Sequence, residues 1–218
     1  VPTIEQIDAA VAANDVGVIM IGRNSGEFID RKAEGDFYLT EAEQTLIRNV
    51  SAAFHKAGKP VVVVLNIGGV IEVASWRDQV DAILLAWQPG QEAGHAMADV
   101  LSGKVNPSGK LTDTFALDLK DYPAAENFPG VTLLGPDPAA SGGIVINDRA
   151  AEVEYRDDIR VGYRHFNTQG VEVAYPFGYG LSYTRFEYRD LKLTREDAGF
   201  MASVIVTNTG RRAGKEVV

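Results

Sequence analysis

A single glutamate, Glu27, holds the position in this sequence that most favours chemistry. It lies in the stretch GRNSGEFIDRK (22–32), which directly follows the apolar run DVGVIMI (15–21). A carboxylic acid that protonates a departing oxygen needs a raised pKa, and therefore partial burial on a positioned loop. Gly26 beside it allows a close approach of the backbone. From spacing alone a solvated loop glutamate is the commoner case, so both interpretations stay open at this point.

The charged residues that follow, Asp30 and Arg31, indicate a local ion pair or a loop anchor rather than a second catalytic group. An arginine can nevertheless orient a nearby carboxylate through its fork of donors. The loop that would support Glu27 is therefore assigned to Ser25, Gly26, Phe28, Asp30 and Arg31.

Other candidate sites are weaker. The three histidines, His55, His95 and His165, are far apart and form no H-x-x-x-H spacing, so the sequence predicts no metal site and no cofactor. The stretch GKVNPSGKL (103–111) fails as a phosphate loop, because its glycine spacing is wrong and it lacks the required Ser or Thr. No serine lies in a G-x-S-x-G turn.

Two aromatic features remain open between structural and binding roles. Trp87, at the end of an expected strand, is either an interior residue or a platform on which a sugar stacks. The stretch PFGYGLSYTRFEY (176–188) either packs two domains together or binds a flat ligand, and the packing role is favoured.

Strands and helices alternate over the first half of the chain. The apolar runs at 16–21 and 60–66 predict strands buried on both faces, as in a parallel sheet. Thr40 and Glu43 form a capping box that begins a helix ending near Gly58. The further expected elements are a helix at 3–14, a short helix at 71–80, a strand at 82–87, a helix at 91–102 that buries Ala93, Ala96, Met97, Val100 and Leu101, and a possible edge strand at 110–115.

This alternation predicts a parallel sheet with helices on both faces. Ligands of such sheets bind beyond the carboxyl ends of the strands. The residues expected just past such ends are Glu27, Gly68, Gly69, Gln88 and Gln91.

The second half of the chain has a different character. Residues 119–150 are rich in Pro, Gly, Ala and Asp without a sustained period, which predicts a long surface connection. From Phe186 onward apolar and polar residues alternate in two stretches, which is typical of antiparallel strands in a β-sandwich. Because two strands cannot close a sandwich, and because the chain begins with Val1 rather than Met, a fragment of a longer protein is expected.

Composition narrows the function classes. The chain of 218 residues is large enough to bury a core, and 45% hydrophobic and 23% charged residues are ordinary for a globular protein. A net charge of −9 argues against nucleic acid or an anionic membrane as the main partner. The sequence contains no cysteine, which excludes disulfides, but the compartment, cytoplasmic or exported, stays open.

Four stretches together resemble glycoside hydrolase family 3 β-glucosidases: SGEFIDRKAEGDFYLTEAEQ, VVVVLNIGGVIEVASW, LLAWQPGQEAGHAMADVLSGKVNPSGKLTDTF and VGYRHFNTQGVEVAYPFGYGLSYTRFEY. The resemblance implies an α/β fold: a partial α/β/α sandwich with a mostly parallel sheet, followed by the first strands of an incomplete fibronectin-III-like β-sandwich. The implied divisions are 1–118 for the sandwich domain, 119–185 for the connection and interdomain aromatic segment, and 186–218 for the start of the fibronectin-like domain.

The resemblance also implies a retaining mechanism on a terminal β-glucosyl residue of a glucoside or oligosaccharide. Glu27 matches the family's general acid/base, and the nucleophile is an Asp on a TIM-like barrel that this chain lacks. Phe28 is a departure, because the family usually has Gly there, and it is expected to narrow the aglycone side or redirect the loop. The isolated chain is expected to be inactive, and a homodimer is possible.

Two other functions compete with this one. The chain would be a non-catalytic carbohydrate-binding or dimerising module if it bound glucose by itself. A flavodoxin-like nucleotide or flavin binder follows from the fold pattern alone, but no G-x-G-x-x-G after a strand supports it.

Overall fold

The computed structural model describes residues 1–24, 31–128, 130–132 and 151–218. The chain forms two compact units, which are described separately: Val1–Gly90 with Asp113–Phe177, and Gln91–Thr112 with Gly178–Val218. Among the helices of these residues, none is both long and apolar enough to cross a lipid bilayer.

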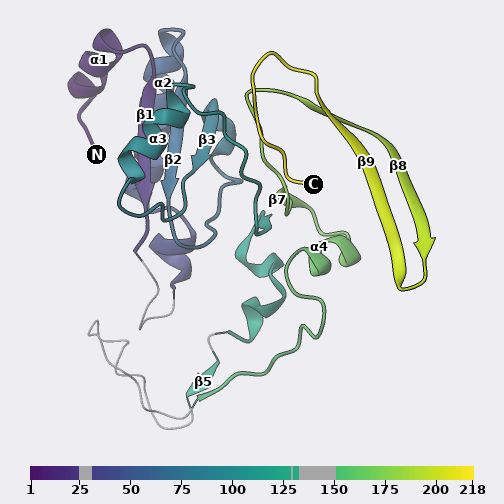
Figure 1. Cartoon of the computed structure of the whole chain (residues 1–218). Coiled ribbons are helices and arrows are strands. Elements are labelled where there is room, and N and C mark those ends of the chain that lie inside the picture. The colour runs from purple at the N-terminus through teal and green to yellow at the C-terminus, as the bar shows by residue number, and fades with distance from the viewer. Residues whose placement is uncertain (25–30, 129, 133–150) are drawn as a thin grey trace. The chain divides into compact units, whose positions relative to one another are not determined.

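The first unit is built on a parallel sheet of three strands in the order β1-β2-β3 (Figure 1). These are β1 Gly17–Gly22, β2 Val61–Asn66 and β3 Ala82–Leu85. In the register, Ile21 lies beside Leu65, and Leu65 lies beside Leu85. The predicted parallel sheet and its three strands are confirmed, and the carboxyl ends of the strands meet at one edge.

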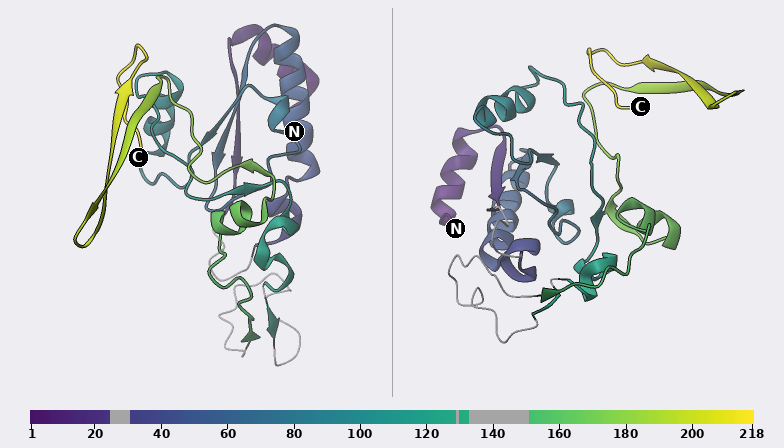
Figure 2. Two further views of the ribbon diagram at one scale, coloured as in Figure 1. Left: turned by 90° about the vertical axis from the view of Figure 1, so that its right-hand side faces the viewer. Right: turned by 60° about the horizontal axis from the view of Figure 1, so that its bottom comes forward.

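Two helices pack beside this sheet, α1 Ile4–Ala13 and α2 Glu41–Lys56 (Figures 1 and 2). Each begins with a complete capping box: the hydroxyl of Thr3 or Thr40 accepts the backbone N–H three residues on, and the side chain there accepts the threonine N–H. The helix expected from Thr40 is therefore confirmed. Helix α2 contacts both β1 and β2, and Ile47 on its inner face is fully buried.

The prediction that the first strand is buried on both faces is wrong. Ile19 and Ile21 are 4% and 2% exposed, whereas Val18 and Met20 on the opposite face are 54% and 56% exposed. β1 is an edge strand, and α1 and α2 cover only one of its faces. The central strand β2 fits the prediction better, because Val61, Val63, Val64 and Leu65 are all buried.

The short helix expected at 71–80 is also wrong, since only Arg77–Gln79 forms a single helical turn. Glu72 accounts for this. Its carboxylate accepts hydrogen bonds from the backbone N–H and the hydroxyl of Ser75, at 2.6 and 2.7 Å. The indole N–H of Trp76 donates to the Glu72 carbonyl at 2.9 Å. These side-chain bonds satisfy the backbone in a compact turn and compete with a helix.

The rest of the first unit consists of short elements. The expected edge strand is reduced to β4 Phe115–Ala116, which pairs antiparallel with β7 Val173–Tyr175. Helix α4, Tyr163–Gln169, was not predicted. The remaining elements are turns at Ala33–Phe37, Leu119–Asp121 and Pro123–Glu126, and the paired strands β5 Val131–Thr132 and β6 Ala151–Glu152.

The second unit contains helix α3, Ala93–Leu101, and the antiparallel strands β8 Phe186–Glu196 and β9 Gly199–Asn208. Both predicted strands are therefore present. The predicted buried side of α3 is wrong, because no residue of this helix is buried and Leu101 is 40% exposed. An apolar stripe is buried only where a second apolar surface covers it, and the described part of this unit supplies none.

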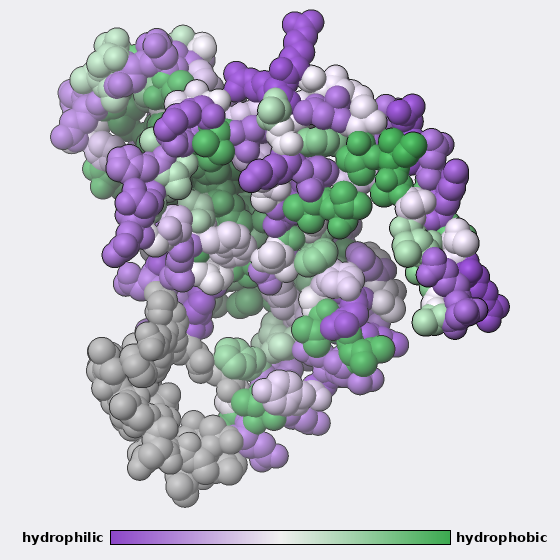
Figure 3. Space-filling view, in the orientation of Figure 1, coloured by the Kyte–Doolittle hydropathy of each residue, from purple (hydrophilic) through white to green (hydrophobic). Residues whose placement is uncertain are grey.

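Asn106 connects three segments of the second unit. Its side-chain oxygen accepts hydrogen bonds from the Ser182 hydroxyl at 3.0 Å and the Tyr183 N–H at 2.8 Å. Its amide donates to the Ala213 carbonyl at 3.0 Å. The expected NPSG turn is thus tied to the segments before β8 and after β9. Polar residues (purple in Figure 3) cover much of the visible surface, with apolar residues (green) between them.

The buried side chain of Ile47 gives a test of the first unit. We expect Ile47→Ala to lower the free energy of unfolding by about 2–5 kcal/mol, because it leaves a cavity where α2 meets the sheet. Ile4→Ala is the matched control, since Ile4 is 70% exposed. Urea unfolding curves of both variants measure the difference. Equal losses would show that α2 does not pack as described.

Candidate functional site

The candidate site is the edge of the sheet at which β1, β2 and β3 end. Arg23 follows β1 directly, Gly68 and Gly69 follow β2, and Trp87 and Gln88 follow β3. The backbone N–H of Arg23 donates to the Asn66 carbonyl at 3.1 Å and extends the pairing of β1 with β2 by one residue. The part of the chain that contains Glu27 thus begins at this edge, where ligands of parallel sheets bind.

Arg23 makes an extensive set of hydrogen bonds. Its two terminal nitrogens donate to the two carboxylate oxygens of Glu43, at 2.6 and 3.0 Å. Its Nε donates to the Asp36 carbonyl at 2.8 Å, and Nη1 also donates to the Gly22 carbonyl at 2.8 Å. The side chain is only 8% exposed. A part-buried, two-pronged arginine–carboxylate pair of this kind has a fixed geometry, unlike a solvated surface pair.

Arg31 bonds to the same turn. Its Nε and Nη2 donate to Oδ1 of Asp36 at 3.0 and 2.8 Å, and its Nη1 donates to the Val70 carbonyl at 2.8 Å. The same Oδ1 lies 3.8 Å from Nε of Arg23. Arg23, Arg31, Asp36 and Glu43 therefore form one group, called the arginine–carboxylate cluster below.

Two glycines give this cluster its space. Gly35 has a positive φ of 76°, which directs the turn at Ala33–Phe37 so that Asp36 faces both arginines. A Cβ on Gly69 would lie 2.7 Å from Nη1 of Arg31, which is too close for the observed bond to Val70. Gly69, in the segment after β2, therefore leaves room for the Arg31 guanidinium.

The third strand ends in an unusual backbone conformation. Trp87 has φ of 52°, and the side-chain amide of Asn66 donates to its carbonyl at 2.6 Å. Its ring is half-buried and lies 6.3 Å from that of Phe115. The Gln88 amide lies against Gly68, where a Cβ would be 2.8 Å from Nε2. A bulky residue at positive φ is strained, and the hydrogen bond from Asn66 helps to hold Trp87 in this conformation. The half-buried Trp87 ring therefore fits neither of the two predicted roles completely: it is not fully interior, and it is not a fully exposed surface for sugar stacking.

Of the loop residues predicted from the sequence, only Arg31 is described. Ser25, Gly26, Glu27, Phe28 and Asp30 lie outside the described residues. Arg31 pairs with Asp36, five residues further on. Sequence reasoning missed Arg23, Asp36 and Asn66. A usable signal existed for Arg23, because a charged residue directly after an apolar strand must reach a partner or solvent.

Glu43 has two roles at once. Its carboxylate accepts the Thr40 N–H at 2.9 Å, which completes the capping box of α2, and it also accepts both Arg23 bonds. Burial raises the pKa of this carboxyl, but the hydrogen bonds from Arg23 and Thr40 outweigh that effect and hold the pKa below its ordinary value. Glu43 is therefore a permanent anion at neutral pH.

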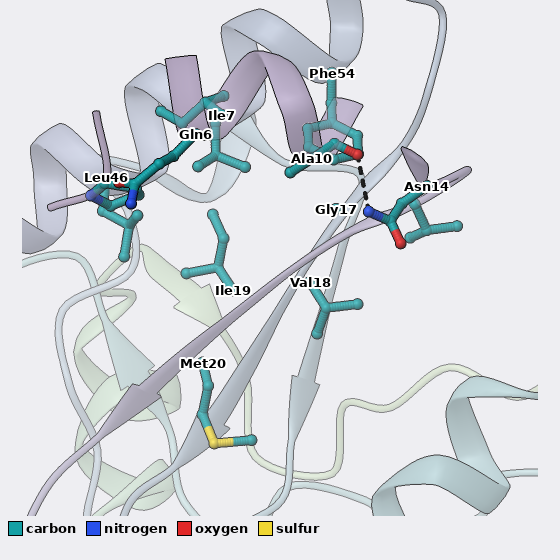
Figure 4. A pocket seen from close by; sticks show the side chains of 13 residues that line it. Gln6, Ile7, Ala10, Asn14, Gly17, Val18, Ile19, Met20, Leu46 and Phe54 are labelled. Atoms are coloured by element: carbon teal, nitrogen blue, oxygen red, sulfur yellow. Dashed lines mark hydrogen bonds between the residues drawn. The ribbon is translucent and has the colours of Figure 1, made fainter. Parts of the chain in front are cut away.

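The described residues contain no group of three or more His, Cys, Asp or Glu side chains able to hold a metal ion. They do contain an apolar groove of about 500 Å³ between α1, β1 and α2 (Figure 4). Ile7 of α1 and Ile19 of β1 point toward each other across it, whereas Val18 and Met20 point away from the helices. None of the described residues that line the groove is ionisable. This groove cannot perform acid–base chemistry, so the carboxyl edge remains the candidate site.

Comparison with known proteins decides the family. The family model described as the glycosyl hydrolase family 3 C-terminal domain matches residues 2–183. The chain belongs to glycosyl hydrolase family 3. The resemblance found in the sequence is thereby confirmed.

Relatives of this family 3 domain include proteins named β-glucosidases and proteins named arabinopyranosidases. Beta-glucosidase A of Butyrivibrio fibrisolvens is 39% identical over 97% of this chain, which corresponds to 28% of that protein. An exo-α-(1→6)-L-arabinopyranosidase of Bifidobacterium longum is 34% identical over the whole chain and 26% of its own length. The chain thus spans about a quarter of each of these family 3 relatives.

Comparison with solved structures also identifies β-glucosidases as similar proteins. β-Glucosidase 3B of Thermotoga neapolitana in complex with α-D-glucose is 49% identical, with a TM-score of 0.85, over 97% of this chain and 28% of that one. The mixed α/β fold with a three-stranded parallel sheet followed by antiparallel strands, as predicted, is that of family 3.

The lowered pKa of Glu43 predicts a pH dependence. A carboxyl with a depressed pKa stabilises the folded protein above the ordinary glutamate pKa of about 4.3, and the contribution is lost as pH falls through the folded value. Glu43→Gln keeps a side chain able to complete the capping box but removes the charge that faces Arg23. We expect its deficit in unfolding free energy to be largest at neutral pH and to shrink below about pH 4.3. Urea unfolding at several pH values measures it, and a constant deficit would contradict this role.

Proposed function

We propose that this chain is the C-terminal part of a retaining β-glucosidase in which Glu27 is the general acid/base. The observation that carries the proposal is that the stretch containing Glu27 leaves the sheet at its carboxyl edge, between two arginines that bond to a common turn. Membership of a family whose relatives here include β-glucosidases supports the reaction class. A loop at a sheet edge suits a group that must reach a partner on another domain.

The proposed chemistry has two steps. An aspartate carboxylate on a barrel domain attacks the anomeric carbon while Glu27 gives its proton to the departing aglycone oxygen. Glu27, now a carboxylate, takes a proton from water, and the hydroxide so formed displaces the aspartate from the anomeric carbon. The two carboxyl groups must then lie about 5–5.5 Å apart, and the anomeric configuration is retained.

The proposed substrate is a glucoside or oligosaccharide with a terminal non-reducing β-D-glucosyl residue. Two relatives named exo-α-(1→6)-L-arabinopyranosidases match the same domain at 34% and 38% identity. Proteins named for activity on different sugars therefore share this domain. This supports the view that sugar preference is set chiefly by residues outside this chain, on the barrel domain.

We also propose the domain division expected from the sequence: a sandwich domain at 1–118, a connection at 119–185, and the first strands of a fibronectin-III-like domain at 186–218. Hairpin β8–β9 supports the last part, because Leu191, Leu193 and Phe200 are 69%, 68% and 75% exposed. A two-stranded hairpin with apolar side chains so exposed needs further strands to cover them.

The decisive variant is Glu27→Gln in the full-length protein. We expect turnover of β-glucosides with poor leaving groups to fall by about 10²–10⁴-fold, because the proton donor is gone. Azide should restore part of the turnover on substrates with good leaving groups and yield a β-glucosyl azide, since this anion attacks the glycosyl-enzyme without a general base. Product analysis and steady-state kinetics measure both effects.

Glu41→Gln is the control, because Glu41 is an exposed glutamate at the start of α2. It should leave turnover unchanged. Near-normal activity of Glu27→Gln without azide would remove Glu27 from the acid/base role. Glucose binding by the isolated chain would instead favour a separate carbohydrate-binding module.

A further inference from the structure

We infer that the arginine–carboxylate cluster positions the acid/base, so that Arg23, Arg31 and Asp36 are positioning residues for glycoside cleavage. The inference rests on the proposed role of Glu27. None of these side chains is given a role in the reaction itself; they act through the segment that Arg23 and Arg31 flank.

The first argument is the placement of the two arginines. Arg23 is the residue directly after β1, and Arg31 lies eight positions later, so that Glu27 is midway between them in sequence. Both guanidinium groups donate to Asp36, one to its carbonyl at 2.8 Å and the other to its carboxylate at 2.8 and 3.0 Å. Because one residue accepts from both, the two ends of the intervening segment are held at a fixed separation.

The second argument is that the cluster is fixed to the fold on three sides. Glu43 connects it to the first turn of α2, where the same carboxylate completes the cap. Arg23 connects it to β1 and, through its N–H, to β2. Arg31 connects it to the Val70 carbonyl in the segment after β2. A part-buried set of charges that joins all three elements restricts movement of the two arginines at the segment's ends more than a single exposed salt bridge would.

The third argument is that burying the charge of Arg23 is unfavourable in free energy, yet the fold contains it. The Arg23 side chain is 8% exposed, and burying a charge is unfavourable unless it is fully paired. Gly69 also leaves room for this arrangement, because a Cβ there would lie 2.7 Å from Nη1 of Arg31 and would displace the guanidinium. An apolar packing of the same volume would hold α2 on the sheet without these charges. Fixed direction and separation are what the charged arrangement adds.

Proton transfer is sensitive to this kind of positioning. A general acid must lie within hydrogen-bond reach of the leaving oxygen, and a displacement of about 1 Å caused by a distant change can cost 10²-fold in rate. A displaced acid mainly slows the cleavage of substrates whose leaving group needs a proton. A general loss of structure slows all substrates alike, so leaving-group dependence separates the two.

The test uses the full-length protein and two variants that disturb the cluster independently. Arg31→Gln removes the bonds to Asp36, and Gly69→Ala displaces Arg31 without changing a member of the cluster. Arg48→Gln is the matched control, because Arg48 is an exposed arginine of α2 whose side chain, within the part of the chain that the structure describes, bonds to Thr45 of the same helix. For each variant kcat/KM is measured with phenyl β-glucoside, which needs protonation, and with 2,4-dinitrophenyl β-glucoside, which does not.

We expect Arg31→Gln and Gly69→Ala to lose about 10-fold or more with phenyl β-glucoside and less than about 2-fold with the dinitrophenyl compound. Arg48→Gln should match the unmodified protein with both. Equal losses with both substrates, or no loss beyond that of Arg48→Gln, would overturn the positioning role. Thermal unfolding of each variant confirms that it is folded at the assay temperature.

Glu27→Gln is measured in the same series so that the two hypotheses can fail separately. If this variant shows the selective loss while the cluster variants do not, only the positioning role is overturned. If Glu27→Gln keeps normal activity with both substrates, the proposed acid/base role fails and the inference falls with it.

Discussion

Asp36 is the residue on which the geometry of the candidate site depends, because it accepts hydrogen bonds from both Arg23 and Arg31. These two arginines stand at the ends of the stretch that contains Glu27. The bonds exist because Gly35, with its positive φ, directs the turn toward them. The site is thus built from a strand end, an irregular turn and a helix start, each of which is short and locally encoded.

The cluster has a rigid support beneath it. Four of the six residues of β2 are buried, and α2, whose Ile47 and Phe54 are buried, contacts both β1 and β2. Interiors of this kind are densely packed and transmit small displacements, so a change in the position of α2 would reach Glu43 and then Arg23. Hydrophobic burial therefore fixes where the elements lie, and the charged groups fix the direction in which the chain leaves them.

Much of this fold could be predicted because its signals are local. Thr40 and Glu43 mark the start of α2 within four residues, and the valines of β2 mark a central strand. Prediction failed where burial depends on neighbours. Val18 and Met20 look interior in sequence but lie on the uncovered face of an edge strand.

Dependence on residues that are distant in sequence also explains which contacts of the candidate site the sequence did not predict. Glu72 ended the expected helix through side-chain bonds that no periodicity reveals. Arg23 bonds to Glu43, twenty positions further along the chain, and Arg31 bonds to the Val70 carbonyl in the segment after β2. Neither partner could be predicted from sequence spacing. The assignment of Glu27 as the acid/base rested on resemblance to a family, because its residue type and position alone also fit an ordinary loop glutamate.

The most direct test of this account is a crystal structure of the full-length protein with glucose bound. The account predicts the Glu27 carboxyl within about 2.6–3.2 Å of the glucose O1, with both arginines still bonded to Asp36. It also predicts an aspartate of another domain about 5–5.5 Å from that carboxyl, on the opposite side of the anomeric carbon. A different acidic residue at O1, with Glu27 directed into bulk solvent, would contradict it.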